Sequence, residues 1–436
     1  MNDKDNPAQA YYLLPEQLCI GIFVELELSW FKHDFAFSSF KICDKAQLRE
    51  VLALHLPRYR YDPERSDMPV TEQSSHEPVG AMSPTPTPDE QGSGDAQVPV
   101  DESPRERFLV QRKQRIQEVE KAFVKATHLL KNINGNLFSK PKETLDYIGD
   151  LVGEMVAAFI DSQDVTLHVM GEKAGGEDVY YHSLNVTILA MMLAKDLGFS
   201  PEAARELGIA AMVHDIGLMK IPDRVLNKFP SEYTSAERNL RAMHVEYGVE
   251  IGRSAGFTAD VLSVMAQHHE FADGSGYPNS LKESAMTPAA RIVSLVNYYD
   301  NLCNPVDIAK AMTPHEALSL MFAQRRSKFE ARALALLIRS LGVYPPGSIV
   351  QLSNEAIAGV ISVNPKSSLR PCVLVYDDKV PKEKGIILNL EIEPEISITK
   401  ALHPAALSPK LVTYLNPRKR VAYFFDGGKH PEIAYA

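Results

Sequence analysis

Five histidines and one aspartate in the middle of the sequence are of the residue types that commonly bind divalent metal ions. His214 and Asp215 are adjacent in "AAMVHDIG", within a largely apolar run, and Leu207, Ala210 and Ala211 share a helical stripe with His214. The other four histidines lie elsewhere in the sequence: His182, His244, His268 and His269. A buried imidazole or carboxylate without a partner is costly, so these side chains need a common one.

A shared pair of cations would satisfy all six side chains. Imidazole and carboxylate without thiolate suit Fe, Mn, Zn or Co, and do not suit a dedicated Ca or Mg cage. One catalytic metal uses about three protein ligands, so six ligands predict two ions, with Asp215 as the natural bridge. Paired ions about 3.5–4 Å apart catalyse phosphoester displacement. We therefore predict a binuclear phosphohydrolase with His214 and Asp215 at its catalytic centre.

The bulk composition excludes several other classes of protein. The chain has 436 residues, of which 45% are hydrophobic and 23% charged, and its net charge of -10 argues against a DNA-binding surface. The 4 cysteines are scattered without a CxxC pair, which is typical of a reducing compartment. The first residues lack a signal-peptide pattern, and no apolar run is long enough to span a membrane. We expect a cytoplasmic protein.

Changes in composition divide the chain into five segments. Residues 66–104 hold 7 prolines, 8 acidic residues and no Lys or Arg, so this segment is predicted to be a disordered linker. The expected fold class is multidomain, with an all-α helical core between two smaller units. The segments are a small α/β unit at 1–65, the linker at 66–104, a connecting helix at 105–140, the helical metal domain at 141–345 and a β-rich subdomain at 346–436.

Apolar residues recur at heptad-like spacing in the connecting helix. Two interpretations stay open for residues 105–131: packing on the helix's own domain, or a homodimer formed through this helix. The residues concerned are Leu109, Ile116, Val119, Phe123, Ala126 and Leu130.

Two motifs together resemble a known family. "HDIG" followed by "HHEFADGSGYP" resembles the signature of HD-GYP proteins, a bacterial branch of the HD-domain phosphohydrolases, over residues 177–325. The N-terminal unit resembles an uncharacterised domain often found before HD-GYP domains. The resemblance implies an all-α HD-type core, two or three Fe or Mn ions, and hydrolysis of cyclic di-GMP. It also suggests diguanylate cyclase-type proteins as partners through the GYP loop.

The resemblance assigns roles to individual residues. The five histidines and Asp215 match the family's metal ligands. Asp178, one helical turn before His182, matches an acidic ligand to a third ion, although a helix-capping role is an equal alternative. Gly276, Tyr277 and Pro278 match the GYP loop, where we expect them to contact the substrate.

The sequence also departs from the family pattern. Asn297 stands where a metal-ligating aspartate is expected, and offers a carbonyl oxygen without a charge, so we predict a weak ligand. Asp300 matches a second aspartate that is normally not the ligand. Cations expected to hold substrate phosphates are replaced by Leu218, Val306 and Ala309, and Lys220 lies near enough in sequence to be a substitute.

Three functions therefore stay open. The first is a cyclic di-GMP phosphodiesterase with reduced activity, since each lost charge-assisted hydrogen bond costs about 1.5–3 kcal/mol. The second is a degenerate, non-enzymatic module that binds signalling partners. The third is a metal phosphohydrolase for another nucleotide.

Overall fold

A computed structural model gives the architecture of the chain in two compact units, Met1–Lys113 and Gln114–Ala436. The predicted linker falls almost wholly outside the described residues. The structure describes residues 10–28, 33, 35, 37–67, 104–136, 139, 141–161, 166–169, 178–363, 367–382, 385–415 and 421–426.

The first unit is a small α/β fold, as the sequence predicts. Its strands form an antiparallel sheet in the order β1-β4-β2-β3. The side chain of Asp44 caps the helix by accepting from the main-chain N–H groups of Ala46 and Gln47. Ile22, Val24 and other apolar side chains form a separate core beneath the sheet. The elements are β1 (Tyr11–Leu13), β2 (Phe23–Glu25), β3 (Ser39–Lys41), α1 (Lys45–Leu52) and β4 (Tyr59–Asp62).

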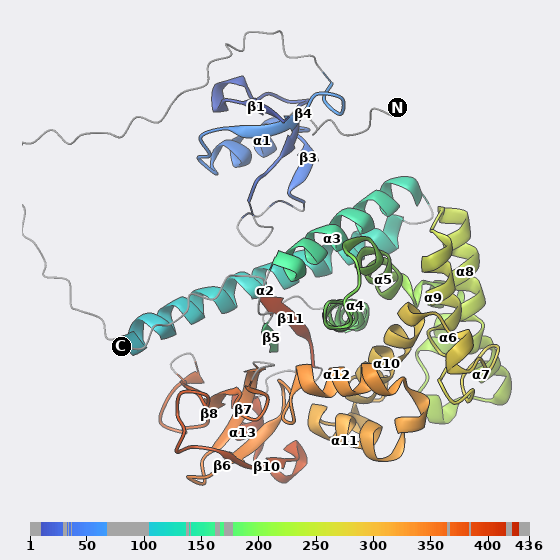
Figure 1. Cartoon of the computed structure of the whole chain (residues 1–436), viewed down its shortest axis with the longest axis vertical. Coiled ribbons are helices and arrows are strands. Elements are labelled where there is room, and N and C mark those ends of the chain that lie inside the picture. The colour runs from blue at the N-terminus through green and yellow to red at the C-terminus, as the bar shows by residue number, and fades with distance from the viewer. Residues whose placement is uncertain are drawn as a thin grey trace, which may run out of the picture. The chain divides into compact units, whose positions relative to one another are not determined.

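The second unit is built around an all-α core (Figure 1). Its central helix is α4, which packs against α3, α5, α10 and α12. Residues 184–194 of α4 are all buried, which explains why this helix is apolar on every side rather than on one stripe. The helices are α2 (Pro104–Asn136), α3 (Pro141–Asp161), α4 (Asp178–Leu197), α5 (Pro201–Val213), α6 (Asp223–Leu226), α7 (Ser235–Ala242), α8 (His244–Ala255), α9 (Ala259–Gln267), α10 (Pro288–Cys303), α11 (Pro314–Gln324), α12 (Ala331–Leu341) and α13 (Pro409–Leu415).

Hydroxyl caps fix where several core helices begin. Ser200 accepts from the N–H of Ala203 at the start of α5, and Thr258 does the same for Val261 at the start of α9. Thr287 caps α10 in the same way, with a proline at the first helical position. These starts set the register of the helices that carry the candidate site.

The described half of the long helix α2 packs inside its own chain. Val119, Phe123, Ala126 and Leu130 are each no more than 2% exposed. The ring of Phe123 stacks on that of Tyr181 with centroids 5.2 Å apart. Packing within the chain therefore accounts for the apolar spacing in this half, while the side chains of Leu109 and Ile116 lie outside the described residues.

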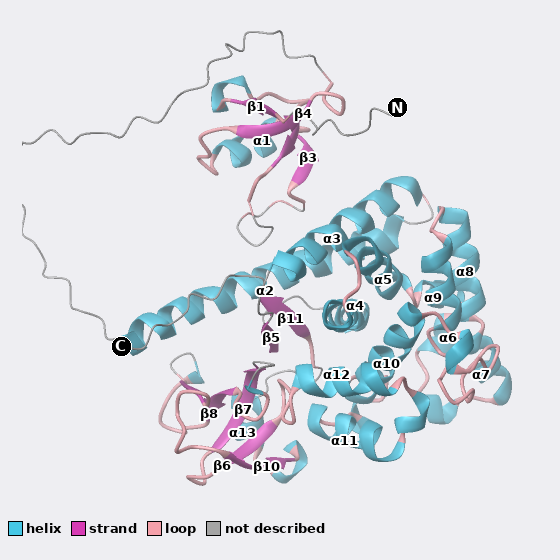
Figure 2. Cartoon of the chain, in the orientation of Figure 1, coloured by secondary structure: helices cyan, strands magenta, loops and turns pink. Residues whose placement is uncertain are grey.

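The strands of the second unit form one seven-stranded sheet (Figure 2). Its path runs β10-β6-β7-β5-β11, and β8 pairs with both β7 and β9. The strands are β5 (Thr166–Val169), β6 (Ile349–Leu352), β7 (Ile357–Val363), β8 (Cys372–Val375), β9 (Ile386–Asn389), β10 (Ile398–Leu402) and β11 (Tyr423–Asp426).

The predicted C-terminal subdomain is confirmed as β-rich, but one of its strands comes from elsewhere. Strand β5 lies between α3 and α4, inside the predicted metal domain, and pairs with β7 and β11. A four-residue strand gives too short a pattern for its partner to be read from sequence. Within the described part of the chain, none of the helices has the length and apolarity that crossing a membrane requires.

Candidate metal centre

Helix ends bring the predicted ligands together. His182 lies in the first turns of α4, His214 immediately follows α5, and His244 begins α8. His268 and His269 come directly after α9. Because each pair of adjacent ligands follows the last residue of a helix, the chain can turn there and aim both side chains at one place. Because α9 ends at Gln267, the neighbouring side chains of His268 and His269 can both reach the site.

The ligand atoms form two clusters that share one residue. The His182 cluster consists of His182, His214 and Asp215, and the His244 cluster consists of Asp215, His244, His268 and His269. Oδ2 of Asp215 lies 3.8 Å from Nε2 of His182 and 3.7 Å from Nε2 of His214. Its other oxygen, Oδ1, lies 3.2 Å from Nε2 of His244 and 3.5 Å from that of His268. Asp215 therefore faces one cluster with each oxygen.

Main-chain carbonyls fix the protonation of three rings. Nδ1 of His214 lies 2.7 Å from the carbonyl of Ala211, and Nδ1 of His268 lies 2.7 Å from that of Met265. His244 makes the same contact with Arg241 at 2.6 Å. A carbonyl only accepts, so Nδ1 must carry the proton, and Nε2 of each neutral ring is a lone pair.

The lone pairs of His244 and His268 face each other at short range. Nε2 of His244 lies 3.2 Å from Nε2 of His268 and also 3.2 Å from Nε2 of His269. Two lone pairs at the distance between His244 and His268 repel each other unless a proton or a cation lies between them. Nε2 of His182 lies 3.3 Å from that of His214, and the raised pKa of His182 favours a proton on that ring.

The bridging carboxylate makes the same demand. Oδ1 of Asp215 is buried and has no hydrogen-bond partner among the described residues. A buried oxygen of this kind is costly unless a cation supplies the missing interaction. The neutral rings and this oxygen together fit divalent metal ions, and the nitrogen and oxygen donor set matches the metals predicted from sequence.

The charges within the site respond to burial. Burial lowers the pKa of His214 to about 3 and, with help from His268, holds the pKa of His269 well below its usual range. Burial alone would raise the pKa of Asp215, but the surrounding imidazoles, His214 first, hold it well below the usual value. The site therefore keeps two rings neutral and the carboxylate charged, which is the form that binds metal.

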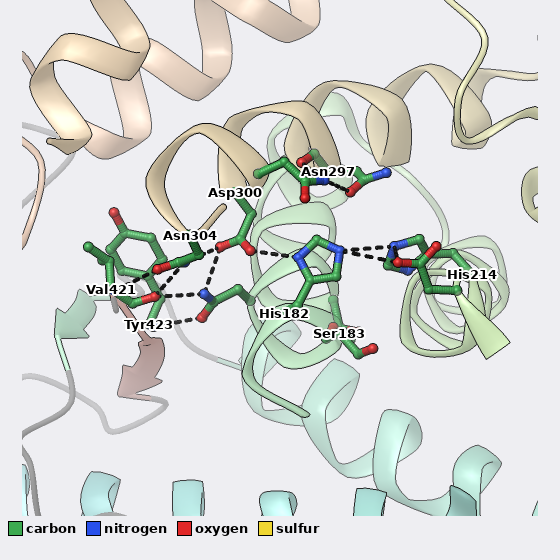
Figure 3. Close-up of polar contacts among 12 residues, drawn as sticks. His182, Ser183, His214, Asn297, Asp300, Asn304, Val421 and Tyr423 are labelled. Atoms are coloured by element: carbon green, nitrogen blue, oxygen red, sulfur yellow. Dashed lines mark hydrogen bonds and ion pairs between the residues drawn. The ribbon is translucent and has the colours of Figure 1, made fainter. Parts of the chain in front are cut away.

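His182 is held by a network that sequence analysis missed (Figure 3). Its Nδ1 lies 2.7 Å from Oδ2 of Asp300, a buried carboxylate on α10. Burial opposes a charge on His182, but Asp300 outweighs it and raises the pKa of the ring. The amides of Asn185 and Asn304 both donate to Oδ1 of Asp300. A carboxylate behind a ligand histidine fixes the ring and strengthens it as a donor.

The GYP loop is tied to the second cluster through its main chain. The buried carboxylate of Glu270 accepts from the N–H groups of Asn279 and Leu281 at 2.6 and 2.8 Å. A Cβ on Gly276 would lie 2.4 Å from Cα of Glu270, so only glycine allows this approach. The ring of Tyr277 stacks on His269 with centroids 4.6 Å apart, and its peptide bond to Pro278 is cis. The loop thus covers one ligand histidine.

The positions of the missing phosphate contacts are apolar. Leu218 packs beside the buried side chains of Ile221 and Val225, while Val306 is 41% exposed and Ala309 is exposed. Lys220 forms a surface ion pair with Glu250 at 2.9 Å. Lys310, next to Ala309, pairs with Asp307 at 3.5 Å. Both cations already have a local carboxylate partner.

Asn297 and Asp178 are the two remaining predicted ligands, and the structure describes the side chain of Asn297 only. Asn297 is 2% exposed, and its Oδ1 accepts from Nδ2 of Asn301 at 2.6 Å, so that oxygen is engaged within α10. Asp178 is the first residue of α4, and its side chain lies outside the described residues.

Comparison with known proteins assigns the three parts of the chain. Residues 155–333 match the HD domain, residues 14–146 a domain of unknown function (DUF3391), and residues 349–410 a KOW domain associated with the HD domain. Residues 155–333 are therefore an HD domain, with a DUF3391 match before it in the sequence and a KOW match after it.

Several curated relatives are cyclic dinucleotide phosphodiesterases. A cyclic di-GMP phosphodiesterase of Pseudomonas aeruginosa is 30% identical over 245 residues, 55% of this chain and 59% of the relative. The cyclic di-GMP phosphodiesterase response regulator RpfG of Xanthomonas campestris is 36% identical over 35% of this chain and 40% of its own length. A 3'3'-cGAMP-specific phosphodiesterase of Vibrio cholerae is 32% identical over 36% and 30% respectively.

Both motifs of the HD-GYP resemblance lie within residues 155–333, which match the HD domain. The chain spans 59% or less of the length of each of these three relatives. The resemblance seen in "HDIG" and "HHEFADGSGYP" is thus confirmed at the level of the domain.

Replacing Asn297 by aspartate should strengthen the His182 cluster. A charged oxygen restores the carboxylate that the family pattern expects, and we expect the weaker of two Mn²⁺ ions to bind about 10–100-fold more tightly. Equilibrium dialysis of the metal-free protein measures this. Asn301→Asp, one helical turn later, adds the same charge; equal tightening in both variants would contradict a ligand role for residue 297.

The stability of metal-free protein should fall with pH below about 6.5. Native His214 and His269 stay neutral while the unfolded rings take up protons, so each costs roughly 1.4 kcal/mol of unfolding free energy per pH unit. The raised pKa of His182 acts in the opposite direction and only above this window. Urea unfolding in EDTA at pH 6.5 and 5.5 measures the slope.

His214→Ala should flatten this slope, because it removes one ring that is held neutral. His55→Ala, in the first unit, is the matched control, because it removes a histidine that is not part of the site. An unaltered slope in His214→Ala would show that His214 is not held neutral in the native state.

Proposed function

We propose that the chain is a metal-dependent phosphodiesterase that hydrolyses cyclic di-GMP with reduced activity. The observation that carries this proposal is that Asp215 belongs to both clusters. Its single carboxylate lies beside His182 and His214 in the His182 cluster and beside His244, His268 and His269 in the His244 cluster. A bridged pair of sites is the arrangement that phosphoester displacement uses. The HD-GYP relatives, which hydrolyse cyclic dinucleotides, support the same reaction.

Each residue of the site has a proposed role. His182 and His214 would hold one ion and His244, His268 and His269 the other, with Asp215 between them. When bound, a pair of Fe or Mn ions supplies an activated water and stabilises the attacking and leaving oxygens of the displacement. His214 is suited to its place because burial keeps its ring neutral at physiological pH. A third ion would require Asp178.

The GYP loop would form one wall of the substrate site. Tyr277 is 37% exposed, so the ring that stacks on His269 with one face can meet a nucleobase or phosphate with its remaining surface. The main chain of Gly276 and Pro278 follows the same wall. The exposed part of this loop is also the surface we propose for contact with diguanylate cyclase-type signalling proteins.

The reduced activity follows from the missing cations. Leu218, Val306 and Ala309 cannot donate to phosphate oxygens, and each lost charge-assisted bond costs about 1.5–3 kcal/mol. Lys220 and Lys310 each form an ion pair with a carboxylate, and an exposed pair of this kind contributes only about 0–1 kcal/mol. Lys220 therefore stays the proposed substitute contact for a substrate phosphate.

A second candidate is a phosphodiesterase for another cyclic dinucleotide. The observation that favours it is that one relative is specific for 3'3'-cGAMP. The same metal centre would serve both substrates. Parallel assays with cyclic di-GMP and 3'3'-cGAMP distinguish the two.

Mn²⁺- or Fe²⁺-loaded protein should convert cyclic di-GMP slowly to linear products. Leu218→Lys combined with Val306→Arg should raise kcat/KM at least about tenfold, since one recovered bond is worth about 1.4 kcal/mol or more. Product chromatography measures both. Asp215→Ala should abolish turnover because both clusters lose their shared ligand.

Met219→Lys is the matched control for the added charge, because Met219 is 45% exposed beside Leu218. An equal gain in this variant would show a general effect of positive charge. A fully metal-loaded protein that hydrolyses neither dinucleotide would favour the non-enzymatic signalling module.

A further inference from the structure

The C-terminal segment of the chain binds directly behind the His182 cluster (Figure 3). The carbonyl of Val421 accepts from Nδ2 of Asn185 at 2.9 Å and from Nδ2 of Asn304 at 2.8 Å. The same two nitrogens donate to Oδ1 of Asp300 at 2.7 and 2.9 Å. Two amides thus bridge one carboxylate oxygen to one main-chain carbonyl more than a hundred residues away in sequence.

The segment also fixes which way both amides face. The N–H of Val421 donates to Oδ1 of Asn304 at 2.7 Å, and the N–H of Tyr423 donates to Oδ1 of Asn185 at 2.8 Å. An amide flip would turn an oxygen toward the carboxylate of Asp300 and leave a main-chain N–H facing an NH₂ group. The docked main chain therefore holds both Nδ2 atoms against Asp300.

Asp300 transmits this constraint to the metal cluster. Its Oδ1 is held by the two amides, so Oδ2 is held in place 2.7 Å from Nδ1 of His182. Nε2 on the far side of that ring is the atom that faces His214. Asp300 and Asn185 are both completely buried, so no solvent is at hand to replace the amide bonds.

We propose that docking of residues 421–423 positions Asp300 and, through it, His182, so that C-terminal docking and metal binding at the His182 cluster stabilise each other. Asn185, Asn304 and Asp300 are positioning residues in this account. The inference rests on the proposed metal centre, and concerns only the assembly of one of its two clusters. Because coupling is reciprocal, it must be measurable from either end.

The segment has its own anchors, which provide a control. The hydroxyl of Tyr423 lies 2.8 Å from that of Tyr299, and Phe424 packs edge-on against Phe123. Strand β11 also pairs with β5. These contacts hold the segment without touching Asp300, so they can be weakened separately from the amide network.

Asn304→Ala should weaken one Mn²⁺ ion selectively. We expect that ion to bind about 10–100-fold more weakly, while the affinity of the His244 cluster for its ion stays the same. Equilibrium titrations followed by the electron paramagnetic resonance signal of free Mn²⁺ measure both affinities. Tyr423→Phe loses hydroxyl contacts but keeps the N–H donated to Asn185 and the pairing of β11 with β5, and while the segment stays docked it should bind both ions as the wild type does. Unchanged affinities in Asn304→Ala, or an equal loss in both variants, would overturn the inference.

Hydrogen exchange measures the coupling from the other end. Mn²⁺ should slow hydrogen exchange of the main-chain amides in residues 421–423 about 10–100-fold in the full-length wild type. It should have no such effect in His182→Ala, which keeps the His244 cluster. Two bound ions with unaltered exchange would overturn this inference and leave the metal centre standing. Protein that takes up no Mn²⁺ would overturn both.

Discussion

The repulsion between imidazole lone pairs is the constraint on which the rest of the structure depends. His214, His244 and His268 each donate their Nδ1–H to the main-chain carbonyl three residues earlier. The Nε2 atom of each neutral ring therefore carries a lone pair and no proton. Nε2 of His244 lies 3.2 Å from that of His268, beside a buried carboxylate oxygen that has no hydrogen bond in the described part of the chain. Such an arrangement is stable only with positive charge inside it, and divalent ions supply that charge while leaving the rings neutral.

The surrounding fold holds this unfavourable arrangement in place. Helix α4 carries His182 and is buried on all sides over residues 184–194, while the ends of α5 and α9 present adjacent pairs of ligands. Asp300 fixes His182 from behind, and Glu270 fixes the loop that covers His269. The C-terminal strand β11 completes the first of these supports. The metal centre thus depends on contacts between residues as far apart in the sequence as Asn185 and Tyr423, 238 positions, and the sheet is part of its framework.

Sequence reasoning predicted which side chains come together better than it predicted the residues that support them. His214 and His244 could be found because imidazoles in apolar helices are unusual, and because the motif around Gly276 is specific. Asn185 and Asn304 gave no such signal, since an asparagine in a helix has no periodic pattern and its partner is a main-chain carbonyl. Strand β5 was missed because its partners lie far away in sequence. The apolar replacement Leu218 was visible in the sequence, but its packing beside Ile221 required the structure.

X-ray anomalous scattering from crystals of the Mn²⁺-loaded protein tests the central claim most directly. The account predicts two Mn²⁺ peaks about 3.5–4 Å apart, one on each side of the Asp215 carboxylate. Its contradiction would be a crystal without ions at this place, in which the five rings are separated from one another and each is hydrogen-bonded to a neighbour of its own.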